Sequence, residues 1–176
     1  MSAVPEPAYR PLTKVLHWLT VAALGAQFTI GYLMDDGSGR GRGRGRGGGS
    51  GRGRGRGGDL EVFGDDGLLT AHVLLGVTIM ALAVTRVLWR RHTALPPWAP
   101  GLSAAERTLA HWTERALYVL LIAIPLTGLW LVLVSDDALA LHIGAHVAFF
   151  VVITLHVGLV LKHQLLDRDN LVRRML

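Results

Sequence analysis

The chain has 176 residues, of which 51% are hydrophobic, and it carries a formal net charge of +5 and no cysteine. The absence of cysteine excludes disulfide bonds, iron–sulfur clusters held by thiolates, and haem attached covalently through a Cys-x-x-Cys-His motif. Four windows approach the roughly 20 apolar residues that are needed to cross a bilayer about 30 Å thick. These windows are residues 14–34, 68–89, 112–134 and 139–161. We therefore predict an all-α integral membrane protein, in which residues 1–176 form a single domain built as an up-down four-helix bundle.

The charged residues that flank these windows predict the orientation of the chain in the membrane. The loop between the third and fourth windows carries Asp136 and Asp137 but no basic residue. Because cytoplasmic loops carry an excess of Lys and Arg, we expect both termini and the middle loop to be cytoplasmic. The basic residues on that side are Arg10, Lys14, Arg90, Arg91, Arg107, Lys162, Arg168, Arg173 and Arg174.

A Gly/Arg tract, GSGRGRGRGRGGGSGRGRGRGG at residues 37–58, places seven arginines in the first loop, on the side assigned to the outside. The tract argues against that orientation, although acidic residues bracket it. With no apolar residue to bury, it is expected to be disordered. It can serve as a flexible linker or as a collector for an anionic substrate. Nucleic acid is not an expected partner, because no aromatic residue is interleaved to stack on bases.

Histidines lie inside the apolar windows, among them His17, His72, His142 and His156. An ionisable group within a bilayer is costly and marks a functional site by default, and neutral imidazole is the commonest metal ligand. His142 and His156 are 14 residues apart, so they share a helix face and differ in height by roughly 21 Å. His17 matches the level of His156, and His72 matches that of His142. These pairs predict two irons, each held by two histidines, within the bundle.

Three further residues support the presence of a flat macrocycle: two glycines at the level of His72 and an arginine at the level of His17. Gly31 lies 14 residues after His17 and Gly76 lies one turn after His72, and glycine permits the close approach that a macrocycle requires. Arg86 lies 14 residues after His72, at the level of the other pair. A buried arginine needs a partner, for which a haem propionate is suitable. The alternative is that Arg86 extends its charge to the membrane interface.

Other histidines leave alternatives open. His146 is one turn from His142 and competes for the same level, and His111 competes for the level of His17 or binds a quinone or propionate. His92 and His163 are expected to be interfacial and solvated. Every histidine in the windows can also simply hydrogen-bond a neighbouring helix, at roughly 0.6–2 kcal/mol. In the third window, Thr127 is expected to satisfy backbone groups near a mid-membrane proline, with no ligand there.

The chain resembles the bacterial cytochrome b561 family of small four-helix membrane proteins with two b haems, which is related to the cytochrome b subunits of nickel–iron hydrogenases. Its first loop departs from the family pattern, because a short polar loop is usual where this chain has the Gly/Arg tract. The matching pieces are YRPLTKVLHW at 9–18, TAHVLLGVTIMALAVTRVLWR at 70–90, AHWTERALYVLLIAIPLTG at 110–128 and the Leu-His-(x)13-His run at 141–156.

The resemblance implies transmembrane electron transfer in the bacterial inner membrane, through two non-covalent b haems with histidine ligands. The positions that match the ligand motif are His17, His72, His142 and His156. Family members include quinone-linked carriers and a type that resembles a superoxide oxidase reducing ubiquinone, so we expect membrane lipid, a quinone and a redox partner protein as partners. Two alternatives are a haem-bearing membrane anchor of a larger oxidoreductase such as a hydrogenase, and a non-redox histidine-rich membrane protein.

Overall fold

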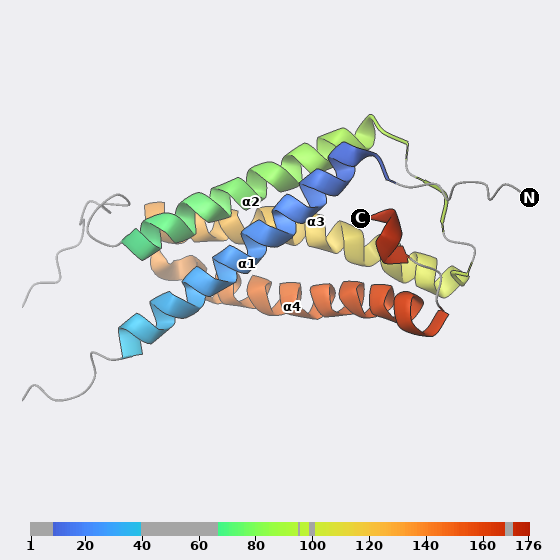
Figure 1. Cartoon of the computed structure of the whole chain (residues 1–176). Coiled ribbons are helices and arrows are strands. Elements are labelled where there is room, and N and C mark those ends of the chain that lie inside the picture. Colours follow the sequence, from blue (N-terminus) through green and yellow to red (C-terminus); the bar gives the residue numbers. More distant parts are fainter. Residues whose placement is uncertain (1–8, 40–66, 95, 99–100, 168–170) are drawn as a thin grey trace, which may run out of the picture.

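In the part of the chain that it describes, the computed structural model has a body of four long helices (Figure 1). The structure describes residues 9–39, 67–94, 96–98, 101–167 and 171–176. The apolar windows fold because their residues favour helix and because a helix satisfies its backbone hydrogen bonds internally, as a membrane requires. The elements are α1 (Pro11–Gly39), α2 (Gly67–Arg91), α3 (Ala104–Leu133), the short η1 (Asp136–Ala138), α4 (Leu139–Lys162), the π-helical turn η2 (His163–Asp167) and η3 (Leu171–Arg174).

The helices alternate in direction, as predicted for an up-down bundle. α1 packs on α2, α2 on α3, and α3 on α4. The beginnings of α1 and α3 and the ends of α2 and α4 lie at one end of the bundle (Figure 1). A small buried core joins the last three helices, through Ile79 and Ala83 of α2, Leu121 of α3 and Phe149 of α4. The predicted all-α fold is therefore confirmed.

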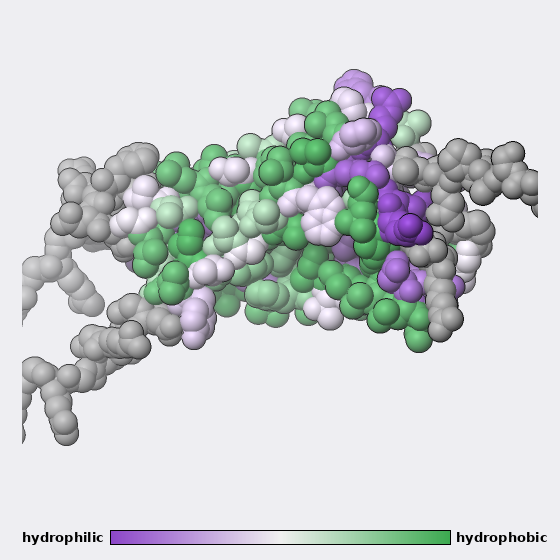
Figure 2. Space-filling view, in the orientation of Figure 1, coloured by the Kyte–Doolittle hydropathy of each residue, from purple (hydrophilic) through white to green (hydrophobic). Residues whose placement is uncertain are grey.

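Apolar side chains cover the outside of the helices, which is the reverse of a water-soluble bundle. Figure 2 shows hydrophobic residues along the helical body, with hydrophilic residues gathered at the end where α1 begins. Among the described residues, three helical stretches are long and apolar enough to cross a membrane: Gly67–Arg91, Ala104–Leu133 and Asp136–Asp167. α1 is not among them, although it spans 29 residues; polar residues such as His17 and Gln27 lie within it. Its role as a fourth span stays a prediction.

Two helices, α3 at its beginning and α1 at its end, extend well beyond the predicted windows. α3 begins at Ala104, because Ser103 and Glu106 form a capping box in which the Ser103 hydroxyl accepts from the Glu106 N–H and Glu106 accepts from the Ser103 N–H. Such a reciprocal pair satisfies backbone donors that a helix start leaves unpaired. α1 runs on to Gly39, so the first three residues of the Gly/Arg tract belong to this helix. The predicted disorder of residues 40–58 falls outside the described residues.

The C-terminal segment returns to the end of the bundle where α1 begins. The Tyr9 N–H donates to the carbonyl of Arg174 at 3.3 Å, and the indole of Trp18 donates to that of Met175 at 3.0 Å. The side chain of Arg174 is buried and donates to the carbonyl of Pro97 at 2.8 Å. The segment therefore ties the start of α1 to the connection between α2 and α3.

Candidate functional site

One cavity lies toward the end of the bundle where α2 and α4 begin, and we call it the His72 cavity; its volume is about 250 Å³. Its polar lining consists of His72 from α2, His142 and His146 from α4, and Gln27 from α1. The amide nitrogen of Gln27 lies 3.2 Å from Nδ1 and 3.1 Å from Nε2 of His72. The Oε1 atom of Gln27 is buried and makes no hydrogen bond within the described part of the chain. The cavity therefore contains histidine nitrogens of the kind that bind a metal, next to an amide oxygen that lacks a hydrogen-bond partner in the described part of the chain.

The side chain of His142 lies directly against α3. Its Nδ1 is 2.8 Å from Oγ1 of Thr127, and a Cβ atom at Gly128 would stand 3.1 Å from its Cε1. Glycine thus gives the imidazole room that a larger residue would restrict. His146 lies one turn further along α4, where its Nδ1 donates to the carbonyl of His142 at 2.9 Å. The two ring centroids are 4.6 Å apart, so both histidines remain candidates for one ligand position.

A second cavity of about 500 Å³ lies toward the opposite end, and we call it the His17 cavity. It is lined by His17 from α1, Arg86 from α2, Tyr118 from α3 and His156 from α4, so every long helix contributes a side chain. Nη2 of Arg86 lies 3.3 Å from Nδ1 of His17. Its guanidinium also stands over the Tyr118 ring, 5.3 Å from the centroid, as a cation–π pair does.

The His17 cavity is also lined by basic groups near the end of the bundle, from Arg10, Arg90 and Arg174. Arg90 forms an ion pair with Glu114 of α3, and Arg174 is buried against the chain as described above. Since Glu114 is the one acidic residue of this lining, the charge around the cavity is positive. Such a surface favours an anionic group.

Three apolar side chains separate the two cavities. Leu24 of α1, Leu121 of α3 and Phe149 of α4 line both of them. Phe149 is 2% exposed and Leu121 is 6% exposed, and both belong to the buried core. The core therefore divides the bundle interior into two compartments along its length.

The structure brings together the histidines that the sequence paired by height. His17 and His156 line one cavity, and His72 and His142 line the other, with His146 beside them. Arg86 is half-buried in the His17 cavity, the place predicted for it. Gly31 lies beside His72, with a Cβ position 3.9 Å from its Cε1. His111 lines neither cavity, which weakens it as a competitor for the level of His17.

Gln27 was not among the site residues predicted from the sequence, and Thr127 was expected to have only a backbone role. Both are polar residues inside apolar windows, and this is the sequence signal that could have identified them. One expectation was wrong: His163 is fully buried instead of solvated. The π-helical turn that starts at His163 directs its ring inward. There the ring lies close to the carboxylates of Glu106 on α3 and of Asp167 on the turn itself. The exposure expected of His92 is confirmed.

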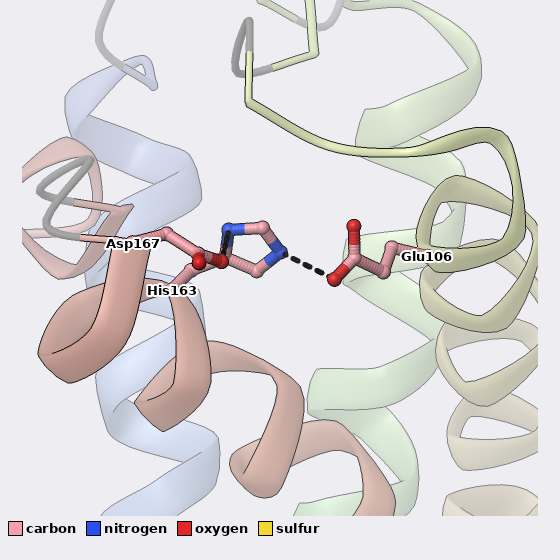
Figure 3. A group of neighbouring side chains, drawn as sticks. All are labelled: Glu106, His163 and Asp167. Carbon is pink, nitrogen blue, oxygen red and sulfur yellow. Dashed lines mark ion pairs between the residues drawn. The ribbon is translucent and has the colours of Figure 1, made fainter.

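The buried His163 belongs to a charged cluster at the end of α4 (Figure 3). Its Nε2 lies 3.6 Å from Glu106 and its Nδ1 lies 3.1 Å from Asp167, so these three residues offer atoms within 4.8 Å of one another for a metal ion. The Lys162 ammonium, however, donates to both carboxylates at 2.7 Å. The lysine thus supplies the cation that these carboxylates require, and the cluster joins α3 to the C-terminal turn.

The ion pair between Lys162 and Glu106 lies outside the apolar windows 112–134 and 139–161. Hydrogen bonds from the Lys162 side chain and from Ser103 lower the pKa of the Glu106 carboxyl to about 2. Hydrogen bonds to Asp167 and Glu106 raise the pKa of Lys162 to about 12. Both groups are therefore charged at neutral pH.

A comparison with protein families identifies the chain. The family described as prokaryotic cytochrome b561 matches residues 8–176. The chain belongs to the prokaryotic cytochrome b561 family. It is also 30% identical over 129 residues to cytochrome b561 homolog 2 of Escherichia coli (strain K12), an alignment that covers 60% of this chain and 68% of that protein. The family assigns b-type haem, a bacterial membrane and haem-dependent transmembrane electron transfer, so the functional class predicted from the sequence is confirmed.

The residues of both cavities fit b-type haem. Histidine imidazole is an axial ligand of haem iron, and each cavity presents it from two different helices. In the His17 cavity, the guanidinium of Arg86 can donate hydrogen bonds to a haem propionate, which only accepts them. The apolar remainder of each lining suits the macrocycle and excludes water.

Proposed function

We propose that this member of the prokaryotic cytochrome b561 family carries electrons across the membrane through two b haems, with both termini in the cytoplasm. His17 and His156 would hold the inner haem, and His72 and His142 the outer one. The observation that carries the proposal is the pair of cavities, each lined by one predicted histidine pair and separated by the apolar core. His142 and His156 stand roughly 21 Å apart along α4, which sets one site near each membrane surface. Haem iron supplies the chemistry when bound, by cycling between its ferrous and ferric states.

Arg86 is proposed to hold an inner haem propionate. Its present contact with Nδ1 of His17 requires a lone pair on that nitrogen, because a guanidinium can only donate hydrogen bonds. If His17 binds iron through Nε2, hydrogen must move to Nδ1, and Nδ1 can then no longer accept from Arg86. The guanidinium is thereby left for an anionic partner in the same cavity, where a buried charge requires one.

A quinone is the proposed electron partner on the inner side. The His17 cavity has about twice the volume of the His72 cavity, with about 500 Å³ against about 250 Å³. Its additional lining includes Tyr9, Trp98 and Met175, near the end of the bundle. Aromatic and apolar walls suit a quinone ring, and the neighbouring basic groups suit its carbonyl oxygens.

Electron transfer across a membrane can be tested in closed vesicles that trap ferricyanide and contain the purified protein. External dithionite is expected to reduce the trapped ferricyanide faster than in empty vesicles, because the two haems form a path through the bilayer. In detergent, ubiquinone is expected to reoxidise the reduced protein. A vesicle rate equal to that of empty vesicles would contradict the proposal, and purification with a large soluble oxidoreductase would favour the anchor alternative.

Superoxide is the proposed donor on the outer side, where the Gly/Arg tract joins the end of α1 to the beginning of α2. Each superoxide would give up one electron to become dioxygen, and two electrons with two protons would convert ubiquinone to its quinol. Changing the seven tract arginines to serine is expected to lower the superoxide-dependent reduction rate and its dependence on salt, because a basic surface attracts the anion. Stopped-flow absorbance measures both quantities; an unchanged rate at low ionic strength would refute this role.

A further inference from the structure

The hydroxyl of Thr127 meets two partners within the α3–α4 contact. Its Oγ1 lies 2.8 Å from the carbonyl oxygen of Ile124 and 2.8 Å from Nδ1 of His142. A hydroxyl has one hydrogen to donate and lone pairs with which to accept. Because a carbonyl can only accept, the hydroxyl hydrogen goes to Ile124, a local bond of the kind that threonine makes inside helices. The Thr127 oxygen is then left as an acceptor toward His142.

This arrangement fixes which nitrogen of His142 carries the hydrogen. Nδ1 must donate to Thr127, so in the neutral ring Nε2 keeps its lone pair. The nitrogen that binds a metal is determined by the hydrogen bond that the other nitrogen makes. His142 is thus prepared to bind iron through Nε2.

The neighbouring glycine fixes the orientation of the same ring. A Cβ atom at Gly128 would stand 3.1 Å from Cε1 of His142, closer than most Cβ contacts, and 3.7 Å from its Nδ1, an ordinary van der Waals distance. The ring therefore rests on the backbone of α3, with Thr127 at one of its nitrogens. Two successive residues of α3 thus control both the tautomer and the position of an imidazole on α4.

We propose that Thr127 is a positioning residue for the outer haem, which acts by holding Nδ1–H of His142; the inference rests on the proposed ligand role of His142. A hydrogen bond from Nδ1–H to an oxygen acceptor makes the imidazole a more basic ligand. A more basic ligand favours ferric over ferrous iron, so Thr127 lowers the reduction potential of the outer haem. His146 makes its own Nδ1 bond to a backbone carbonyl and does not share this contact.

The test compares Thr127→Val, which keeps the shape and removes the oxygen, with Thr127→Ser, which keeps the hydroxyl. Thr127→Val is expected to raise the midpoint potential of the outer haem alone in an optical redox titration. It should also weaken retention of that haem by roughly 10-fold or more, as is typical when such a partner is lost. Thr127→Ser should behave like the wild type, which a merely steric role would not predict. His142→Ala identifies the outer component as the one that it removes.

The outcomes separate this inference from the function on which it rests. If His142→Ala removes one haem while Thr127→Val leaves both potentials unchanged, the positioning role is wrong and the ligand assignment stands. A serine variant that shifts as much as the valine variant would also overturn the positioning role. If His146→Ala removes the haem and His142→Ala does not, the ligand assignment fails, and the inference fails with it.

Discussion

Replacing His156 with alanine is expected to remove the inner haem from the purified protein and to leave the outer one in place. His156 lines the His17 cavity, whereas the histidines of the other cavity lie beyond the apolar residues that separate them. Loss of one axial imidazole takes away a bond that the remaining apolar lining cannot replace. The pyridine haemochrome assay against protein concentration measures the loss, and a redox titration shows which component has disappeared.

His17→Ala should give the same result, because both histidines belong to one proposed ligand pair. His111→Ala is the matched control, since His111 lies near the same end of the bundle but lines neither cavity. It is expected to keep both haems and both potentials. Loss of haem in His111→Ala with retention in His17→Ala would reassign the inner ligand to α3 and contradict the proposed pairing.

Phe149→Ala is expected to have the largest effect on stability. This side chain is 2% exposed, contacts Phe28 of α1 and lines both cavities. Its removal joins the two compartments into one space, and phenylalanine-to-alanine changes in packed cores cost roughly 3–5 kcal/mol. Unfolding in a denaturing detergent, followed by circular dichroism, measures the change in free energy.

The next residue supplies the control for this substitution. Phe150 also contacts Phe28, but it is 51% exposed on the outside of the bundle. Phe150→Ala leaves no enclosed cavity, so its cost should be much smaller than that of Phe149→Ala. Equal destabilisation by the two variants would show that Phe149 has no special place between the compartments.

Much of the architecture could be predicted because it depends on local periodicity. The apolar windows determine the helices, and the 14-residue spacing of His142 and His156 places them on one face whatever the neighbouring helices do. The alternating direction of the helices then pairs His156 with His17 and His142 with His72. The resemblance to the cytochrome b561 family added the cofactor, which spacing alone only suggested.

The remaining features depend on contacts between helices, which the pattern of one helix does not reveal. The bond between Thr127 and His142 requires the packing of α3 on α4, and the contact of Gln27 with His72 requires α1 on α2. His163 was expected in solvent because it follows an apolar window, yet a π-helical turn buries it. The capping box at Ser103 is different, because its Ser-x-x-Glu spacing was legible in the sequence.

The number of haems in the wild-type protein bears most directly on the proposed arrangement of two ligand pairs. Purified protein should show the sharp reduced-minus-oxidised bands of low-spin b haem, with about two haems per chain, as two levels of two histidines each require. A redox titration of the same sample should resolve two components. One haem per chain, or a spectrum without low-spin b haem, would contradict the pairing of His17 with His156 and of His72 with His142.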